Sequence, residues 1–85
     1  MRQKSGLGKQ SGLPASVGTV SDVGEIVESV RKQQGLTQLD VSGLTGLGVR
    51  FMVDLEKGKP TIQMQKVLDV LAQLGLEIVI AKKGP

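Results

Sequence analysis

Residues 36–58 read LTQLDVSGLTGLGVRFMVDLEKG and contain two short helical patterns on either side of a glycine-rich turn. Thr37 is of a type that caps helix starts, and Gly46 can take the left-handed conformation that ends a helix. A first helix is therefore expected between these residues, and a second between Gly48 and Gly58. The first carries Leu39, Val41 and Leu44, and the second is expected to hold Met52 and Leu55 inward.

Two short helices joined by a tight turn have the spacing of a helix-turn-helix. In that motif the first helix crosses the DNA backbone and the second lies in the major groove. Gly46 suits the turn because only glycine reaches positive φ without strain from a β-carbon. Glycine turns between helices are common, so the spacing by itself is only a moderate signal.

Two amphipathic helices are expected to flank this pair. Upstream, Asp22 and Glu25 have the spacing of a capping box, and the helix should end at Gly35. Downstream, a helix should end at Gly75. The apolar residues at helical spacing are Val23, Ile26, Val27 and Val30 upstream and Met64, Val67, Leu68, Leu71 and Leu74 downstream. The pattern predicts a mainly all-α domain of four to five helices.

Residues 76–81, LEIVIA, alternate in the manner of a β-strand. A lone strand leaves its backbone donors and acceptors unpaired, and a symmetric partner could satisfy them with an antiparallel ribbon. A homodimer is therefore predicted, with dimerisation through Leu76, Ile78, Val79 and Ile80. The alternative is that this segment continues the preceding helix, which Gly75 and the β-branched side chains oppose.

The composition excludes several classes of function. A chain of 85 residues is one domain's length, since domains usually run from roughly 50 to 250 residues. It has no cysteine and no histidine, so thiol nucleophiles, the usual zinc sites and the commonest general base are absent, and an enzyme, a metal site or a cofactor is not expected. Its one aromatic residue, Phe51, offers no platform for stacking unpaired bases. No apolar stretch suggests a membrane span or a secretory signal, so a cytoplasmic protein is expected.

The chain divides near residue 21. Residues 1–20, rich in Gly, Ser and Gln, are expected to form a flexible arm whose three cations, Arg2, Lys4 and Lys9, could follow DNA or lie in a solvated tail or cloning remnant. Residues 21–75 form the predicted helical domain, and residues 76–85 the strand with a short basic tail. Three of the 11 basic residues precede residue 21, which leaves 8 basic and 8 acidic groups in residues 21–85. Any basic face must therefore come from the placement of charges.

Residues 31–77 resemble the phage-repressor helix-turn-helix family, also called Cro/cI or XRE. The matching residues are the Leu-Thr-Gln of 36–38 and the Leu-Glu-Lys-Gly of 55–58. From residue 46 onward the chain is most similar to HipB-type antitoxins, the partners of HipA-type kinase toxins. The resemblance covers about residues 21–81 and implies a dimeric repressor that binds a palindromic operator in double-stranded DNA, regulates its own operon and restrains the toxin.

The chain departs from the family at three places. Thr45 stands where a small apolar residue is usual, and Gly48 replaces the usual Ser or Thr cap of the third helix. The chain ends at Pro85, without the longer tail of some relatives, which puts toxin-dependent ordering of such a tail in doubt.

The resemblance assigns base reading to the start of the third helix. Arg50 is the best candidate because a guanidinium can donate two hydrogen bonds to guanine, while Val49 and Val53 could contact thymine methyl groups. The structural alternative for Arg50 is a surface ion pair with Asp54 at i, i+4.

Further contacts are predicted around the motif. The family position of Gln38 touches the backbone and braces a base-reading side chain, and Thr37 could bind phosphate or serve only as a cap. Lys57 and Lys59 could also reach phosphates. Phe51 is expected to pack in the core or an interface, and the family pattern pairs Glu56 with a cation for which Arg31 is the candidate.

The first helix exposes acidic residues that would repel DNA, namely Asp22, Glu25 and Glu28. This acidic face is either the toxin contact or an ordinary solvated surface. Two other functions remain open: an XRE or phage-type regulator without a toxin partner, and a protein-interaction module that does not use DNA, which the balanced charge favours.

Overall fold

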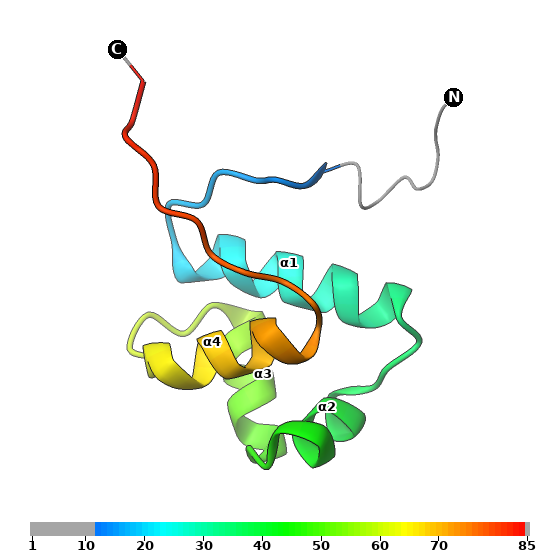
Figure 1. Ribbon diagram of the computed structural model, residues 1–85. Helices are drawn as coiled ribbons and strands as arrows, with labels where there is room; N and C mark the ends of the chain where they lie inside the picture. Colours follow the sequence, from blue (N-terminus) through cyan, green and yellow to red (C-terminus); the bar gives the residue numbers. More distant parts are fainter. Residues whose placement is uncertain (1–11, 85) are drawn as a thin grey trace, which may run out of the picture.

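The computed structural model describes residues 12–84, which fold into four helices (Figure 1). Within that part of the chain no strand is formed. The helices are α1 (Val20–Gln33), α2 (Gln38–Thr45), α3 (Val49–Lys57) and α4 (Met64–Gln73). α1 packs on α3, while α2 contacts both α3 and α4. The predicted all-α class is confirmed.

α1 begins one turn earlier than expected, so the predicted capping box was wrong. Thr19 is the N-cap, and its hydroxyl accepts from the amide of Asp22 at 3.1 Å. Asp22 in turn accepts from the amides of Gly18 and Thr19, so it is the third residue of the helix. Thr19 serves as the N-cap because its backbone is extended, with φ −142° and ψ 162°, as an N-cap requires.

The four predicted helix ends are confirmed. Gly35, Gly46, Gly58 and Gly75 all have positive φ, between 73° and 82°. After α3 the amide of Lys59 donates to the carbonyl of Asp54 at 3.0 Å, which satisfies a carbonyl that the helix leaves open. Each helix therefore ends next to a glycine, the residue that adopts positive φ without strain and lets the chain change direction.

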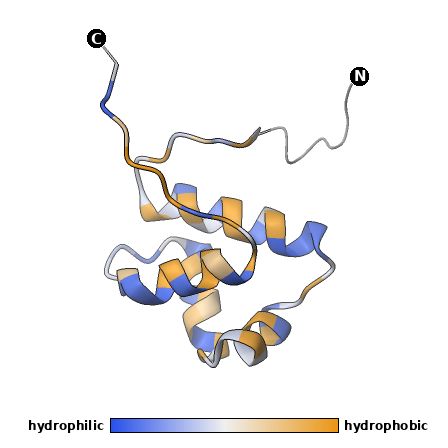
Figure 2. Cartoon of the chain, in the orientation of Figure 1, coloured by the Kyte–Doolittle hydropathy of each residue, from blue (hydrophilic) through white to orange (hydrophobic). Residues whose placement is uncertain are grey.

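The core lies between the facing sides of the four helices, along which hydrophobic and hydrophilic residues alternate (Figure 2). Met52 and Leu55 of α3 are fully buried, as predicted, and Phe51 packs half-buried against the same cluster. The other buried apolar residues are Val27, Val30, Val41, Val67, Val70, Leu71 and Leu74. By contrast, Leu39 and Leu44 of α2 and Met64 of α4 are exposed.

α1 and α3 approach at backbone distance. A β-carbon on Gly24 would lie 2.3 Å from the carbonyl oxygen of Leu55. Where α3 ends, a β-carbon on Gly58 would lie 2.6 Å from the α-carbon of Ser21. Any larger residue at Gly24 would push the two helices apart. The glycine at this position therefore determines how closely α1 and α3 can pack.

The chain ends leave the helical body on the same side. In Figure 1 the segment before α1 and the segment after α4 both run along the α1 side, away from α2. Helix continuation beyond α4 is excluded, because Gly75 has φ 79° and the amide of Leu76 closes the helix on the carbonyl of Leu71. The strand expected over 76–81 is not formed, since residues 12–84 contain no second strand to pair with it, and it stays a prediction. Of the expected arm over 1–20, residues 1–11 lie outside the described residues.

Candidate nucleic-acid interface

Side-chain hydrogen bonds fasten the turn between α2 and α3. Ser42 donates from its hydroxyl to the carbonyl of Leu47. Thr45 donates to the carbonyl of Val41 at 2.8 Å, and its hydroxyl accepts from the amide of Leu47 at 3.3 Å. Thr45, which departs from the family pattern, therefore replaces apolar packing with hydrogen bonds. These contacts were missed from the sequence, although hydroxyl residues flanking a glycine turn are a usable signal.

α3 presents one continuous outer face. Successive residues of a helix are about 100° apart, so Val49, Arg50, Val53, Asp54 and Lys57 fall on the side opposite the buried residues. The Arg50 side chain is 85% exposed, and Val49 is exposed as well. Val53 is half-buried. The structure thus brings the three predicted base-reading residues together on one accessible strip.

Asp54 forms ion pairs with two basic side chains, Arg50 and Lys59. Its two carboxylate oxygens lie 3.2 Å from Nε of Arg50 and 3.7 Å from Nζ of Lys59. The Arg50–Asp54 ion pair, which was the structural alternative for Arg50, is therefore present in the free chain. The Asp54 side chain is only 18% exposed, but Arg50 is 85% exposed, and solvent screening of such a pair limits its contribution to about 0–1 kcal/mol. Arg50 would consequently lose little by exchanging Asp54 for a base edge.

The start of α2 is closed by a capping box. The Thr37 hydroxyl accepts from the amide of Asp40 at 3.0 Å, and the Asp40 carboxylate accepts from the amide of Thr37 at 2.8 Å. The backbone hydrogen bond from Thr37 lowers the pKa of Asp40, so its charge stays at the helix start. The Thr37 amide is thus occupied, and only its hydroxyl proton is left to donate to a phosphate.

A buried network joins the other end of α3 to the rest of the domain. Arg31 donates through Nε and Nη2 to the two oxygens of Glu56, at 2.6 and 2.8 Å, which confirms the predicted pair. Its Nη1 donates to the carbonyl of Leu36 at 2.9 Å. The two charged side chains are only 8% and 5% exposed, and the hydrogen bond that Arg31 donates to Glu56 raises the pKa of Arg31.

Gln38 belongs to this network as well. Its side-chain amide donates to Oε1 of Glu56 at 3.0 Å, which ties the first residue of α2 to α3. Glu56 therefore links α1, α2 and α3. Gln38 was predicted to brace a base-reading side chain, but in the free chain it holds α2 against Glu56 of α3. Its half-buried side chain does not lie on the exposed strip of α3.

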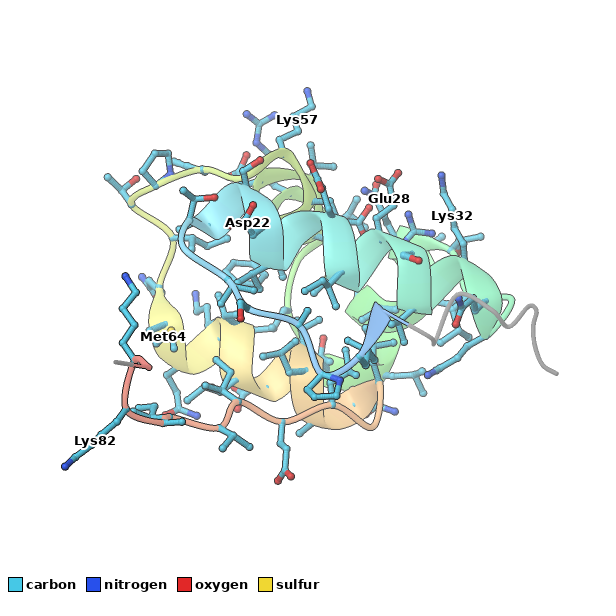
Figure 3. The ribbon with its side chains drawn as sticks, turned by 90° about the horizontal axis from the view of Figure 1, so that it is seen from above. Asp22, Glu28, Lys32, Lys57, Met64 and Lys82 are labelled. Carbon is cyan, nitrogen blue, oxygen red and sulfur yellow. The ribbon has the colours of Figure 1, made fainter. Side chains whose placement is uncertain are left out.

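The charged residues of α1 lie apart from that strip. Lys57 projects from the last turn of α3, whereas Asp22, Glu28 and Lys32 lie along α1 (Figure 3). Glu28 pairs with Lys32 at 3.0 Å, and Asp22 is engaged at the helix cap. Two of the three predicted acidic residues of α1 thus already have partners within the chain.

Residues 12–84 offer little for other chemistry. They hold no group of three His, Cys, Asp or Glu side chains that could bind a metal ion. A membrane-crossing helix, which must be long and apolar, is likewise not found among the four helices described.

Two short helices fastened at a tight glycine turn, the second with an exposed face, define a helix-turn-helix protein. The chain is 52% identical over 66 residues to the uncharacterized HTH-type transcriptional regulator y4mF of Sinorhizobium fredii (strain NBRC 101917 / NGR234). The match spans 78% of this chain and 87% of that relative. This protein belongs to the family of HTH-type transcriptional regulators. No protein-family model matches the chain.

Solved structures of HipB have the same fold. A HipB–O4 20mer complex superposes with a TM-score of 0.76 at 16% sequence identity, covering 82% of this chain and 99% of that one. A second HipB complex, with an O2 20mer, gives the same score and identity and covers 97% of its chain. The HipB-like helix-turn-helix fold expected from the sequence is confirmed.

Proposed function

We propose that this regulator is a homodimeric, sequence-specific repressor that reads a palindromic operator in double-stranded DNA with α3. The observation that carries this proposal is the exposed strip of α3, on which the Arg50 side chain is 85% exposed. The Arg31–Glu56 network holds the opposite side of α3 in the domain. A rigid helix with one free face is what reading of base edges requires.

Each predicted contact has a place in this proposal. Arg50 exchanges Asp54 for a guanine, while Val49 and Val53 meet thymine methyl groups. The Thr37 hydroxyl, Lys57 and Lys59 contact phosphates at the two ends of the motif. Gln38 acts indirectly, by holding α2 against Glu56. Residues 21–85 carry equal numbers of basic and acidic groups, so they have no general excess of positive charge to attract DNA. Binding therefore depends on these few cations.

The homodimer supplies the twofold symmetry that a palindrome needs. Residues 76–81 of two copies form an antiparallel ribbon, in which Leu76, Ile78, Val79 and Ile80 make the contact. Support comes from the exposure of Val79 and Ile80, at 75% and 94%, on a segment that has no partner strand within the part of the chain that the structure describes. The two copies of α3 are then expected to lie one helical turn of DNA apart.

The regulator is further proposed to be the antitoxin of a HipA-type kinase and to repress its own operon. The resemblance of residues 46–77 to HipB-type antitoxins and the HipB-like fold support this step. The α1 face with Glu25 and Glu28 is the candidate contact. Co-expression with a kinase gene adjacent to its own should give a stable complex and reduced kinase activity. A regulator without a toxin partner would bind DNA and leave the kinase unaffected.

The DNA-binding proposal is tested by selecting genomic fragments with the purified protein and footprinting the recovered site at two salt concentrations. A protected palindrome upstream of its own gene is expected. Arg50→Ala should lose discrimination at one base pair of each half-site, by about 1–3 kcal/mol. Lys57→Ala should weaken binding to all sequences and flatten the salt slope by about one per half-site.

Lys32→Ala is the matched control, because Lys32 is an exposed lysine on α1, outside the strip. It should leave both affinity and specificity unchanged. Equal losses by Arg50→Ala on operator and random DNA would remove Arg50 as a base reader. Absence of any enriched fragment at low salt would refute the DNA-binding proposal and favour a protein-interaction module.

A further inference from the structure

The exposed strip of α3 contains one acidic side chain, Asp54, between its basic ones. Its carboxylate is 18% exposed, whereas Arg50 and Lys59, which pair with its two oxygens, are 85% and 55% exposed. Oδ1 lies 3.2 Å from Nε of Arg50, and Oδ2 lies 3.7 Å from Nζ of Lys59. The carboxylate therefore has one exposed cation beside each oxygen.

The two cations are joined to Asp54 in different ways. The backbone amide of Lys59 donates to the backbone carbonyl of Asp54 at 3.0 Å, so Lys59 stays beside Asp54 whatever its side chain contacts. Arg50 lies one helical turn earlier, and its side chain meets Asp54 through the ion pair. When Arg50 turns to a guanine, Oδ1 loses its cation while Oδ2 keeps Lys59.

An oxygen uncovered in this way faces DNA and needs a hydrogen-bond donor. An ionised carboxylate accepts hydrogen bonds and donates none, and the phosphates of DNA repel it. In the major groove the donors are the amino groups at N4 of cytosine and N6 of adenine. Adenine presents the acceptor N7 beside its amino group, whereas cytosine presents only the donor. The uncovered oxygen therefore favours cytosine.

We propose that Asp54 is a specificity-determining residue, which accepts a hydrogen bond from the N4 amino group of a cytosine near the guanine read by Arg50. The inference rests on the proposed reading of DNA by α3 and deepens it. Residues four positions apart lie about 6 Å apart along a helix, and successive base pairs lie about 3.4 Å apart. The cytosine is thus expected within about two base pairs of the guanine.

The same oxygen disfavours the other bases. Thymine and guanine present acceptors, O4 and O6, where cytosine presents its amino group. A carboxylate placed against an acceptor loses hydration without gaining a partner. Asp54 thus adds a repulsive element to the attraction between Arg50 and guanine, and specificity commonly uses both.

Asp54→Asn gives the sharpest test, because asparagine has nearly the same shape and pairs with adenine through N6 and N7. Operator fragments with randomised half-sites are selected with each protein, and the recovered bases are counted. The wild type should select cytosine at one position near the guanine, and Asp54→Asn should select adenine there while keeping the guanine. In the wild type, thymine in place of that cytosine in one half-site should weaken binding about fivefold or more.

Asp54→Ala is the second variant, and it should lose the preference at that position without gaining one for adenine. Asp69→Asn is the matched control, since it removes the same charge from an exposed carboxylate of α4 that accepts from Gln65 at 3.0 Å. Its base preferences should equal those of the wild type. Circular dichroism checks that all variants stay folded.

The substitution at Asp54 also spares the segment proposed to dimerise. Residues 13–17 and 75–79 enclose an apolar cavity of about 490 Å³ against α1 and α4, and no residue of α3 lines it. A changed base preference in Asp54→Asn therefore reports on the α3 strip and not on the dimer contact.

The outcomes separate this inference from the proposed function. If Asp54→Asn strengthens binding to all sequences equally and keeps the wild-type base preferences, Asp54 acts only through its charge. The inference is then refuted, and DNA reading by Arg50 stands. If the wild type selects no sequence at all, the proposed function and the inference are refuted together.

Discussion

The buried ion pair between Arg31 and Glu56 gives a prediction whose size follows from burial. Glu56→Gln keeps the shape of the side chain and removes its charge, which leaves the guanidinium of Arg31 buried without a counter-ion, with the carbonyl of Leu36 and a single amide oxygen as acceptors. Breaking a buried pair in this way costs about 3–5 kcal/mol. The amide of the variant can still accept one hydrogen bond, so we expect a loss near 3 kcal/mol.

A domain of this size has a free energy of unfolding of about 4–11 kcal/mol, so the variant should remain folded at low temperature. Its melting temperature should fall by about 12–24 °C, because 1 kcal/mol corresponds to about 4–8 °C in a domain of 60–100 residues. Urea titration at 25 °C, with the slope compared between variants, measures the loss directly.

Glu28→Gln is the matched control for this experiment. Glu28 also forms an ion pair, at 3.0 Å from Nζ of Lys32, but the two side chains are 44% and 64% exposed. An exposed pair at i, i+4 contributes about 0.3–0.5 kcal/mol. Losses of equal size in the two variants would refute the argument that burial, and not the ion pair as such, determines the contribution of Glu56.

Further predictions concern the helix contact and the caps. Gly24→Ala should destabilise the fold by about 1–3 kcal/mol, because its β-carbon would overlap the carbonyl of Leu55. Gly43→Ala, at an α2 position with open space around it, should instead stabilise by up to about 1 kcal/mol; thermal melts that gave both variants the same sign would contradict this reasoning. Backbone hydrogen bonds lower the pKa of Asp22 and of Asp40, from Gly18 and Thr37 respectively. Stability from these caps should thus be complete above about pH 4 and be lost as the pH falls through the lowered values. Urea midpoints between pH 6 and pH 2.5 should fall less steeply in Asp40→Asn than in the wild type, and parallel curves would exclude this linkage.

Much of the site was predictable because its signals are local. The positive φ at Gly46 and the capping by Thr37 depend on residues within a few positions, and the periodicity of α3 placed Met52 and Leu55 inward. The Arg31–Glu56 pair joins residues 25 positions apart. It was predicted through resemblance to a family, since no local pattern links the two residues.

Other features escaped the sequence because two elements compete for the same role. Both Thr19 and Asp22 can cap a helix, and the backbone conformation of Thr19 decided between them. Leu39 and Leu44 are apolar and lie on a predicted helix, but α2 has too few turns to bury more than the Val41 side, and both remain exposed. Burial on so short a helix depends on which neighbours reach it.

The sequence by itself determined where each helix ends, which face of each long helix is apolar and where the turn of the motif lies, because these properties follow from backbone preferences and spacing along the chain. The tertiary structure alone decided how closely α1 lies on α3, that Gln38 braces Glu56, and that residues 13–17 and 75–79 enclose a cavity. Those features join segments distant in sequence, and their geometry exists only once the helices have packed.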